Sequence, residues 1–263
     1  MAVFLGTTGR YTLNGLFAAA TVCVLMVDTM NWILIEPLRG RGLRLRSTIE
    51  HFVEFGYRSM PIIGMISFLI GVIMAMQSAY TLKKFGAELF IANLVGISAV
   101  RELAPLMTAI LITGRSGSAI TAEIGSMKVA EEIDALHVMG LNPTKYLVVP
   151  KFLAMLIAVP CATILSMFIM ILGGFFIAVA VLHIDFDSYY NQTAIALVGK
   201  DLFTGIVKSF FFAIVICWTG VYRGFQVEGG AEGVGQKTTS SVVTSIFIII
   251  VVDMLWTSLF YFT

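Results

Sequence analysis

Five apolar stretches divide this chain, each about as long as the ~20 residues that an α-helix needs to cross a hydrocarbon core. They cover residues 61–80, 89–113, 152–182, 202–222 and 242–262. Arg101 and Glu102 interrupt the second stretch. The third is long enough that it should tilt, kink at Pro160 or extend beyond the membrane. The pattern predicts a bundle of five transmembrane helices.

A further apolar stretch, residues 11–35, has two interpretations. Asn14, Thr21 and Asp28 recur every seven residues, which on a helix gives a narrow polar stripe. A helix lying in the membrane interface has such a stripe, and so has a sixth span packed against protein. Hydropathy leaves both alternatives open.

Lysine and arginine gather on alternate connections. Eleven of them lie within 36–60, 114–151 and 223–241, whereas the intervening connections carry only Lys83, Lys84 and Lys200. Because basic loops stay on the cytoplasmic side, the first three segments should face the cytoplasm. The C-terminus then ends on the opposite side.

Composition supports a membrane protein and argues against other classes. Hydrophobic residues make up 58% and charged residues 13%, about half of the roughly 25% usual in soluble domains. The net charge is +1 and no basic run is present, which gives no case for nucleic-acid binding. No catalytic or metal-binding spacing occurs. The scattered histidines and cysteines are expected to be surface or interfacial histidines and buried free thiols: His51, His137, His183, Cys23, Cys161 and Cys217.

Residues 230–238 nearly match a phosphate-binding P-loop. In a true P-loop the lysine directly follows the second glycine, whereas here Gln236 separates Gly235 from Lys237. A soluble α/β domain to carry the motif is also missing. We interpret the segment as a flexible cytoplasmic loop and expect any ATPase to be another chain.

Four ionisable residues fall inside the apolar stretches: Arg101, Glu102, Lys208 and Asp253. Unpaired charges in hydrocarbon cost several kcal/mol, so such residues face a bundle interior or a watery cavity. Pro105 cannot donate a hydrogen bond to the carbonyl of Arg101, which predicts an irregular helix there. The group is either a structural ion-pair network or a binding site for a charged headgroup.

Two rows of small residues follow at four-residue spacing: Gly114, Ser118, Ala122, Ser126 and Ala130, and beside them Gly117, Thr121 and Gly125. On a helix they form a face without bulk, where another backbone can approach closely. The face is either a tight crossing within the chain or a packing surface along which helices shift.

The segment 123–134 is short, amphipathic and charged. Its ionisable residues are Glu123, Lys128, Glu131, Glu132 and Asp134. Lys128 stands three and four residues before two of the acids, which favours one helix that the pair at 142–143 would stop. It is either a solvated helix resting on the membrane face or a docking helix for a cytoplasmic partner.

The residues RELAPLMTAILITGRSGSAITAEIGSMKVAEEIDAL, from Arg101 onward, are followed by MGLNP. Together they resemble the signature region of the MlaE/YrbE family, the permease subunits of ABC-type lipid transporters that work with Mce-domain proteins. The similarity continues through KSFFFAIVICWTG around Lys208 to the span with Asp253, and covers roughly residues 55–263.

This resemblance implies an all-α integral membrane protein with five transmembrane helices and a cytoplasmic coupling helix. Residues 1–50 would be an interface helix with a basic linker, and 51–263 the permease domain. It also implies a homodimer in the bacterial inner membrane, two cytoplasmic ATPase subunits that hold ATP and Mg²⁺, and a periplasmic Mce-domain ring. The substrate would be phospholipid moved between inner and outer membranes, which maintains outer-membrane lipid asymmetry.

Carried over by position, Tyr80, Arg101 and Glu102 would line the lipid pocket, and residues 123–134 would be the coupling helix. No catalytic residue, metal or cofactor is expected on this chain. One alternative is an ion-driven secondary transporter with Glu102 and Asp253 as proton sites, although no inverted repeat with broken helices is evident. Another is a structural anchor, which would need no charged cytoplasmic surface.

Overall fold

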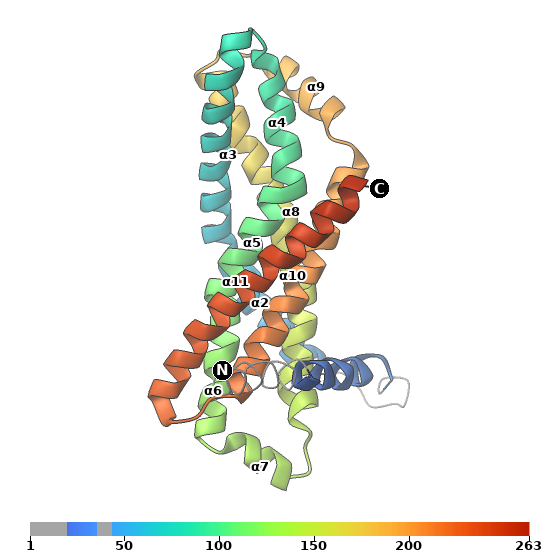
Figure 1. Cartoon of the computed structure of the whole chain (residues 1–263), viewed down its shortest axis with the longest axis vertical. Helices are drawn as coiled ribbons and strands as arrows, with labels where there is room; N and C mark the ends of the chain where they lie inside the picture. The colour runs from blue at the N-terminus through green and yellow to red at the C-terminus, as the bar shows by residue number, and fades with distance from the viewer. Residues whose placement is uncertain (1–19, 36–43, 263) are drawn as a thin grey trace, which may run out of the picture.

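The computed structural model describes residues 20–35 and 44–262, and every regular element in those ranges is helical (Figure 1). The predictions for residues 11–19 and for the basic residues Arg39 and Arg41 lie outside the described residues. Five helical runs are long and apolar enough to cross a membrane. They are Leu45–Phe85, Glu88–Val129, Thr144–Ala180, Gly199–Phe225 and Gly230–Phe260, which confirms the five predicted spans.

Most of these runs are composite. The first joins α2 (Leu45–Phe55) to α3 (Met60–Leu82), and the second joins α4 (Ile91–Ser98), α5 (Ala104–Ile112) and α6 (Ser118–Val129). The others are built on α8 (Val149–Ala180), α10 (Gly199–Phe225) and α11 (Gly230–Phe262). Two short helices, α7 (Glu132–Val138) and α9 (Phe186–Ala196), lie at opposite ends of the bundle (Figure 1).

Two of the three π-helical turns in the described residues precede a proline, which removes a backbone donor; the third is Thr113–Gly117. Pro105 follows the π turn Ala99–Leu103, in which the Ala104 amide donates to the Ala99 carbonyl five residues back. Pro150 follows the π turn Thr144–Val148 in the same way. The widened turn takes up the hydrogen-bonding mismatch that each proline creates. The irregular helix predicted near Arg101 is thereby confirmed.

The closest helix crossing joins α3 to α8. A Cβ atom added to Gly71 would lie 2.0 Å from the Met170 carbonyl oxygen, and one added to Gly173 would lie 2.3 Å from that of Phe68. The hydroxyls of Ser67 and Ser166 are 2.7 Å apart in the same buried contact. Small residues therefore bring the two backbones into direct contact, as in other tightly packed membrane helices.

The helix Ala20–Leu34 lies across the bundle near one end and does not run along it (Figure 1). It is shorter than the spans, and Leu25, Met26 and Ile33 pack its inner side against the main core. An amphipathic helix in this position is typical of the membrane interface. Of the two interpretations of this stretch, the described part supports the interface helix.

Two expectations were wrong. Residues 230–238 belong to α11 and are not a loop, because Gly229 and Gly230 adopt φ values of +83° and +75° and make a sharp turn where the helix begins. Of the cysteines, only Cys217 is buried. Cys23 and Cys161 are exposed on the surface of this chain, where an apolar thiol can face lipid as readily as a core.

Candidate functional site

The charged residues of three spans meet at Lys208 on α10. Its ammonium nitrogen lies 2.5 Å from Oε2 of Glu102, on the π turn, and 2.9 Å from Oδ1 of Asp253, on α11. It also donates a hydrogen bond of 2.7 Å to the hydroxyl of Thr257. The Thr257 hydroxyl lies 3.1 Å from Oε1 of Glu102. The ion-pair network foreseen for these residues is therefore present.

Lys208 is the buried centre of this network. Its side chain is 0% exposed, it donates hydrogen bonds to Glu102 and Thr257, and Oδ1 of Asp253 lies at ion-pair distance without a hydrogen bond. The π turn rotates Glu102 toward α10, and Thr257 follows Asp253 by one helical turn. Thr257 was not proposed from the sequence as a site residue. Its four-residue spacing from Asp253, which places both on one helix face, could have indicated it.

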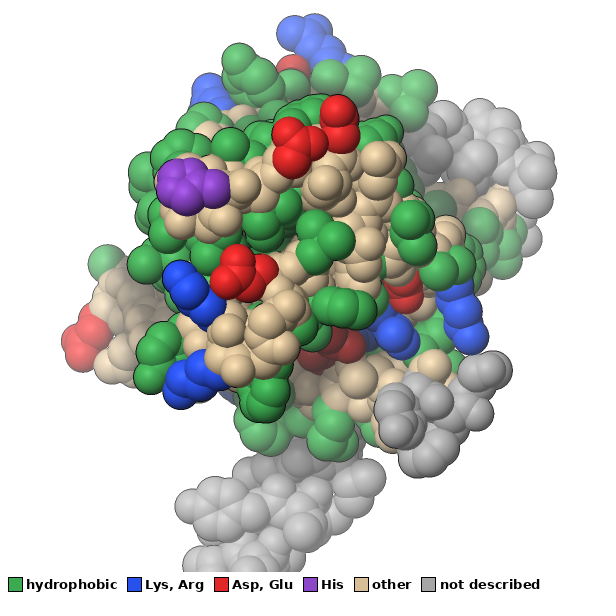
Figure 2. All heavy atoms as spheres, turned by 90° about the horizontal axis from the view of Figure 1, so that it is seen from above, with side chains coloured by type: hydrophobic (Ala, Val, Ile, Leu, Met, Phe, Trp, Pro, Cys, Tyr) green, Lys and Arg blue, Asp and Glu red, His purple; other side chains and the backbone are tan. Residues whose placement is uncertain are grey.

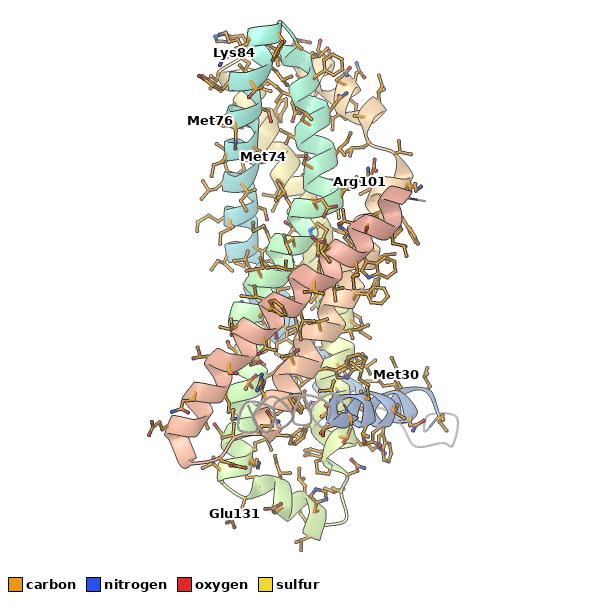
Figure 3. The ribbon with its side chains drawn as sticks, viewed as in Figure 1. Met30, Met74, Met76, Lys84, Arg101 and Glu131 are labelled. Atoms are coloured by element: carbon orange, nitrogen blue, oxygen red, sulfur yellow. The ribbon has the colours of Figure 1, made fainter. Side chains whose placement is uncertain are left out.

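Arg101 points to a different partner. Its Nε lies 3.5 Å from Oδ1 of Asp201, in the first turn of α10, and the Arg101 side chain keeps 38% exposure (Figure 3). Asp201 also accepts the Val198 amide at 3.1 Å, which fixes the carboxylate at the helix start. Among the described residues Arg101 has no further ion pair, so its terminal nitrogens stay available to an anion. Asp201 was not anticipated.

Tyr80 does not join this group. It is 71% exposed, and the Lys84 ammonium lies 4.4 Å from the centre of its ring. Figure 3 shows Lys84 at one end of the molecule, well away from Arg101. Figure 2 looks onto that end, where charged side chains lie scattered among hydrophobic ones. Within one chain the structure thus brings Glu102, Lys208 and Asp253 together but leaves Tyr80 apart.

A second buried lysine lies toward the other end of the bundle. Lys151, on α8, is 1% exposed, and its Nζ lies 2.7 Å from Oε1 of Glu123 on α6 and 3.2 Å from Nε2 of His51 on α2. The three side chains tie three helices together. The sequence pattern predicted His51 at the surface and Lys151 in a charged connection. It therefore did not predict this cluster.

The segment 123–134 is not one helix. The α-helix α6 ends at Val129, Glu131 adopts the left-handed φ of +57°, and α7 begins at Glu132. Lys128 does not support a continuous helix through the acids, because its ammonium donates to the Phe225 carbonyl at 2.7 Å. The prediction of a single amphipathic helix was therefore wrong.

The break leaves a charged corner at the tip of the molecule. Glu131, Glu132 and Asp134 are exposed, whereas Ile133 and Leu136 of α7 are buried against the core. Figure 3 shows Glu131 at this tip. A short helix fixed by apolar anchors and charged on its outer side can contact a partner as a rigid body.

The two rows of small residues face different ways. An added Cβ would lie 3.1 Å from Ile216 at Gly117 and 2.6 Å from Val227 at Gly125, and the Thr121 hydroxyl donates to the Gly220 carbonyl at 3.0 Å. That row is a tight crossing within the chain. The row that begins at Gly114 is more open, and no atom lies within 4 Å of a Cβ added at Gly114.

Comparison with known proteins gives a consistent result. The family model described as Permease MlaE matches residues 48–259. A probable ABC transporter permease protein of Rickettsia prowazekii is 34% identical over 231 residues, 88% of this chain and 89% of the relative. One of Synechocystis is 36% identical over 83% of both chains. The intermembrane phospholipid transport system permease protein MlaE of Haemophilus influenzae is 33% identical over 81% of this chain and 82% of the relative.

Proposed function

Because this chain belongs to the MlaE permease family of ABC transporters, we propose that it forms the membrane pathway of a phospholipid transporter. Two copies would work in the bacterial inner membrane with cytoplasmic ATPase subunits and a periplasmic Mce-domain ring. Lipid would move between the inner and outer membranes and so maintain outer-membrane asymmetry. The observation that carries the proposal is the similarity to the Haemophilus influenzae protein over most of both chains.

The proposed headgroup contact is Arg101. Its guanidinium is the partly exposed cation of the group, whereas Lys208 is fully buried and paired with Glu102 and Asp253. A guanidinium suits a phosphate because it can donate two parallel hydrogen bonds. Glu102 then acts through Lys208 to hold the π turn in place. Tyr80, exposed at the end of α3, would contact lipid elsewhere along the same pathway.

The proposed coupling element is α7 with the corner at Glu131. Its outer acids would meet the ATPase, and its buried side would pass movement to α6. The same helical run continues from α6 to the π turn with Arg101. The open row of small residues on α6 supports close packing against a second copy.

Replacing Arg101 by Gln, with Arg101→Lys as the matched control, tests the substrate role. In the assembled transporter, Arg101→Gln should lower both lipid transfer and the stimulation of ATPase activity by lipid, and Arg101→Lys should retain more of both. If Arg101→Gln leaves both unchanged, the headgroup role is wrong.

Charge reversal at Glu131, Glu132 and Asp134 tests the coupling role. The reversed variant should lose ATPase co-purification while keeping its thermal unfolding temperature, because these side chains are exposed. Unchanged association would favour the anchor alternative. The ion-driven alternative, with Glu102 and Asp253 as proton sites, predicts transport that needs no nucleotide-binding subunit.

A further inference from the structure

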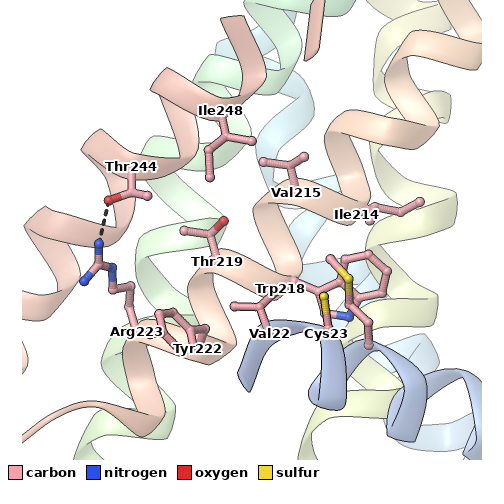
Figure 4. Close-up of a pocket in the computed structure, with 11 residues that line it drawn as sticks. Val22, Cys23, Ile214, Val215, Trp218, Thr219, Tyr222, Arg223, Thr244 and Ile248 are labelled. Carbon is pink, nitrogen blue, oxygen red and sulfur yellow. Dashed lines mark hydrogen bonds between the residues drawn. The ribbon is translucent and has the colours of Figure 1, made fainter. Parts of the chain in front are cut away.

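A groove separates the interface helix Ala20–Leu34 from α10 and α11 (Figure 4). Its volume is about 420 Å³, within the roughly 300–1,000 Å³ of small-molecule sites. Apolar side chains form most of the wall. The lining residues are Val22, Cys23, Met26, Ile214, Val215, Trp218, Thr219, Tyr222, Arg223, Thr244 and Ile248.

At one end of the groove lies an arginine that has no carboxylate as an ion-pair partner among the described residues. Arg223 is half-buried and donates to the Thr244 hydroxyl at 3.0 Å and to Oε1 of Gln226 at 3.5 Å. None of the ion pairs among the described residues includes Arg223, and its buried Nε has no hydrogen-bond partner there. Nε is enclosed by protein, but the guanidinium retains its charge, and its two terminal nitrogens carry four N–H groups, of which these two bonds use only two.

The groove wall also includes an indole ring. Trp218 is 7% exposed, and its indole Nε1 is buried without a hydrogen-bond partner in the described part of the chain. Figure 4 shows the indole beside Cys23 of the interface helix. Because this nitrogen is closed off from solvent, the indole adds an apolar face to the groove wall and not a donor for a ligand.

The position of the groove along the bundle matches a lipid molecule. Arg223 lies in the last turn of α10 and lines the groove together with Val22 and Cys23 of the helix that lies across the bundle (Figure 4). Ile214 and Val215 precede Arg223 by nine and eight residues, which at 1.5 Å per residue places them about 12–14 Å deeper along the span. A cation at the interface with apolar wall below it complements a phosphate joined to an acyl chain.

We propose that this groove binds one anionic phospholipid of the leaflet predicted to face the cytoplasm. The phosphate lies at Arg223, and an acyl chain lies against Ile214, Val215 and Ile248. The bound lipid fastens the interface helix to α10 and α11. This site is separate from Arg101, and it stands whether or not the same lipid is transported.

Tryptophan fluorescence tests the proposal, because Trp218 forms part of the wall. In the full chain carrying Trp32→Phe and Trp256→Phe, Trp218 is the remaining indole. The protein is reconstituted with phosphatidylglycerol or phosphatidylcholine that carries bromine on its acyl chains, and quenching is titrated. Phosphatidylglycerol should quench Trp218 at lower mole fraction, and Arg223→Gln should reduce that preference roughly tenfold, the value of a charged hydrogen bond.

Two matched controls isolate the site. Arg46→Gln removes an arginine that is 94% exposed, and should leave the preference intact. A chain that keeps Trp256 in place of Trp218 should be quenched equally by both lipids. Arg223→Lys retains the charge and should retain part of the preference, which separates loss of the site from loss of folding.

Three results would overturn the proposal. Equal quenching of Trp218 by the two lipids means that no headgroup is recognised. Absence of quenching means that protein fills the groove, either residues 1–19 or a second copy. Loss of the phosphatidylglycerol preference in millimolar inorganic phosphate, to the same extent for lipids with short and with long acyl chains, means that the site takes free phosphate and not lipid.

Discussion

Lys208→Met should be among the most damaging single substitutions in this protein. Methionine matches the length and apolar stem of lysine but has no charge. The substitution therefore leaves Glu102 and Asp253 facing each other across the place where the ammonium lay 2.5 Å and 2.9 Å from their oxygens. It also removes the donor to Thr257.

The expected loss follows from burial. Breaking a buried ion pair by removing one partner costs about 3–5 kcal/mol, because the remaining charge stays desolvated. The Glu102 side chain is 36% exposed and Asp253 only 16%, so water can relieve the first carboxylate more than the second. We therefore expect a loss of about 3 kcal/mol in the free energy of unfolding.

Reversible unfolding in mixed detergent micelles measures this loss. Lys83→Met is the control, because Lys83 is exposed and has no ion pair among the described residues, and it should change stability by under about 1 kcal/mol. Adding Glu102→Gln and Asp253→Asn to Lys208→Met should recover part of the loss, since the cluster is then neutral. A Lys208→Met variant as stable as Lys83→Met would refute the reasoning.

Three further predictions concern packing, the second lysine and the corner. Gly71→Ala should destabilise the α3–α8 crossing by about 1–3 kcal/mol or more, whereas Gly114→Ala, with open space around its Cβ, should cost nothing by the same measurement. Glu123→Gln and Lys151→Met should be non-additive, with a coupling of about 0.5–3 kcal/mol in a double-mutant cycle, and additive losses would contradict their contact. Glu131→Gly should raise the thermal unfolding temperature and Glu131→Val should lower it, since the left-handed backbone costs an L-residue about 1–2 kcal/mol, and equal effects would speak against strain there.

The spans were predictable because membrane crossing needs only length and apolar composition, which any window of the sequence displays. The π turn at Ala99–Leu103 was predictable for a similar reason, since Pro105 acts on a carbonyl four residues away. Both are local properties of the chain.

The partners of the buried charges were only partly predictable. Lys208 with Glu102 could be proposed because charges inside apolar spans must pair, but Asp201 and Lys151 lie where the sequence reads as connection. Their burial depends on how far each helix extends and which face turns inward. The corner at Glu131 was not predicted for a related reason. Lys128 donates its hydrogen bond to the Phe225 carbonyl on another helix and not to the acids that follow it in the sequence.

The small-residue rows alone suggest that helices slide past each other. The buried ion pairs indicate a different movement. The run Glu88–Val129 is held near Arg101 by Lys208 and toward its other end by Lys151, each from a neighbouring helix. The buried row of small residues is tightly packed against α10, so sliding along it would break close contacts. A run pinned at two levels moves as one body, and its freedom lies in the turn at Glu131. Movement of α7 would thus reach Arg101 as a tilt of the whole run and not as a shift of one helix past another.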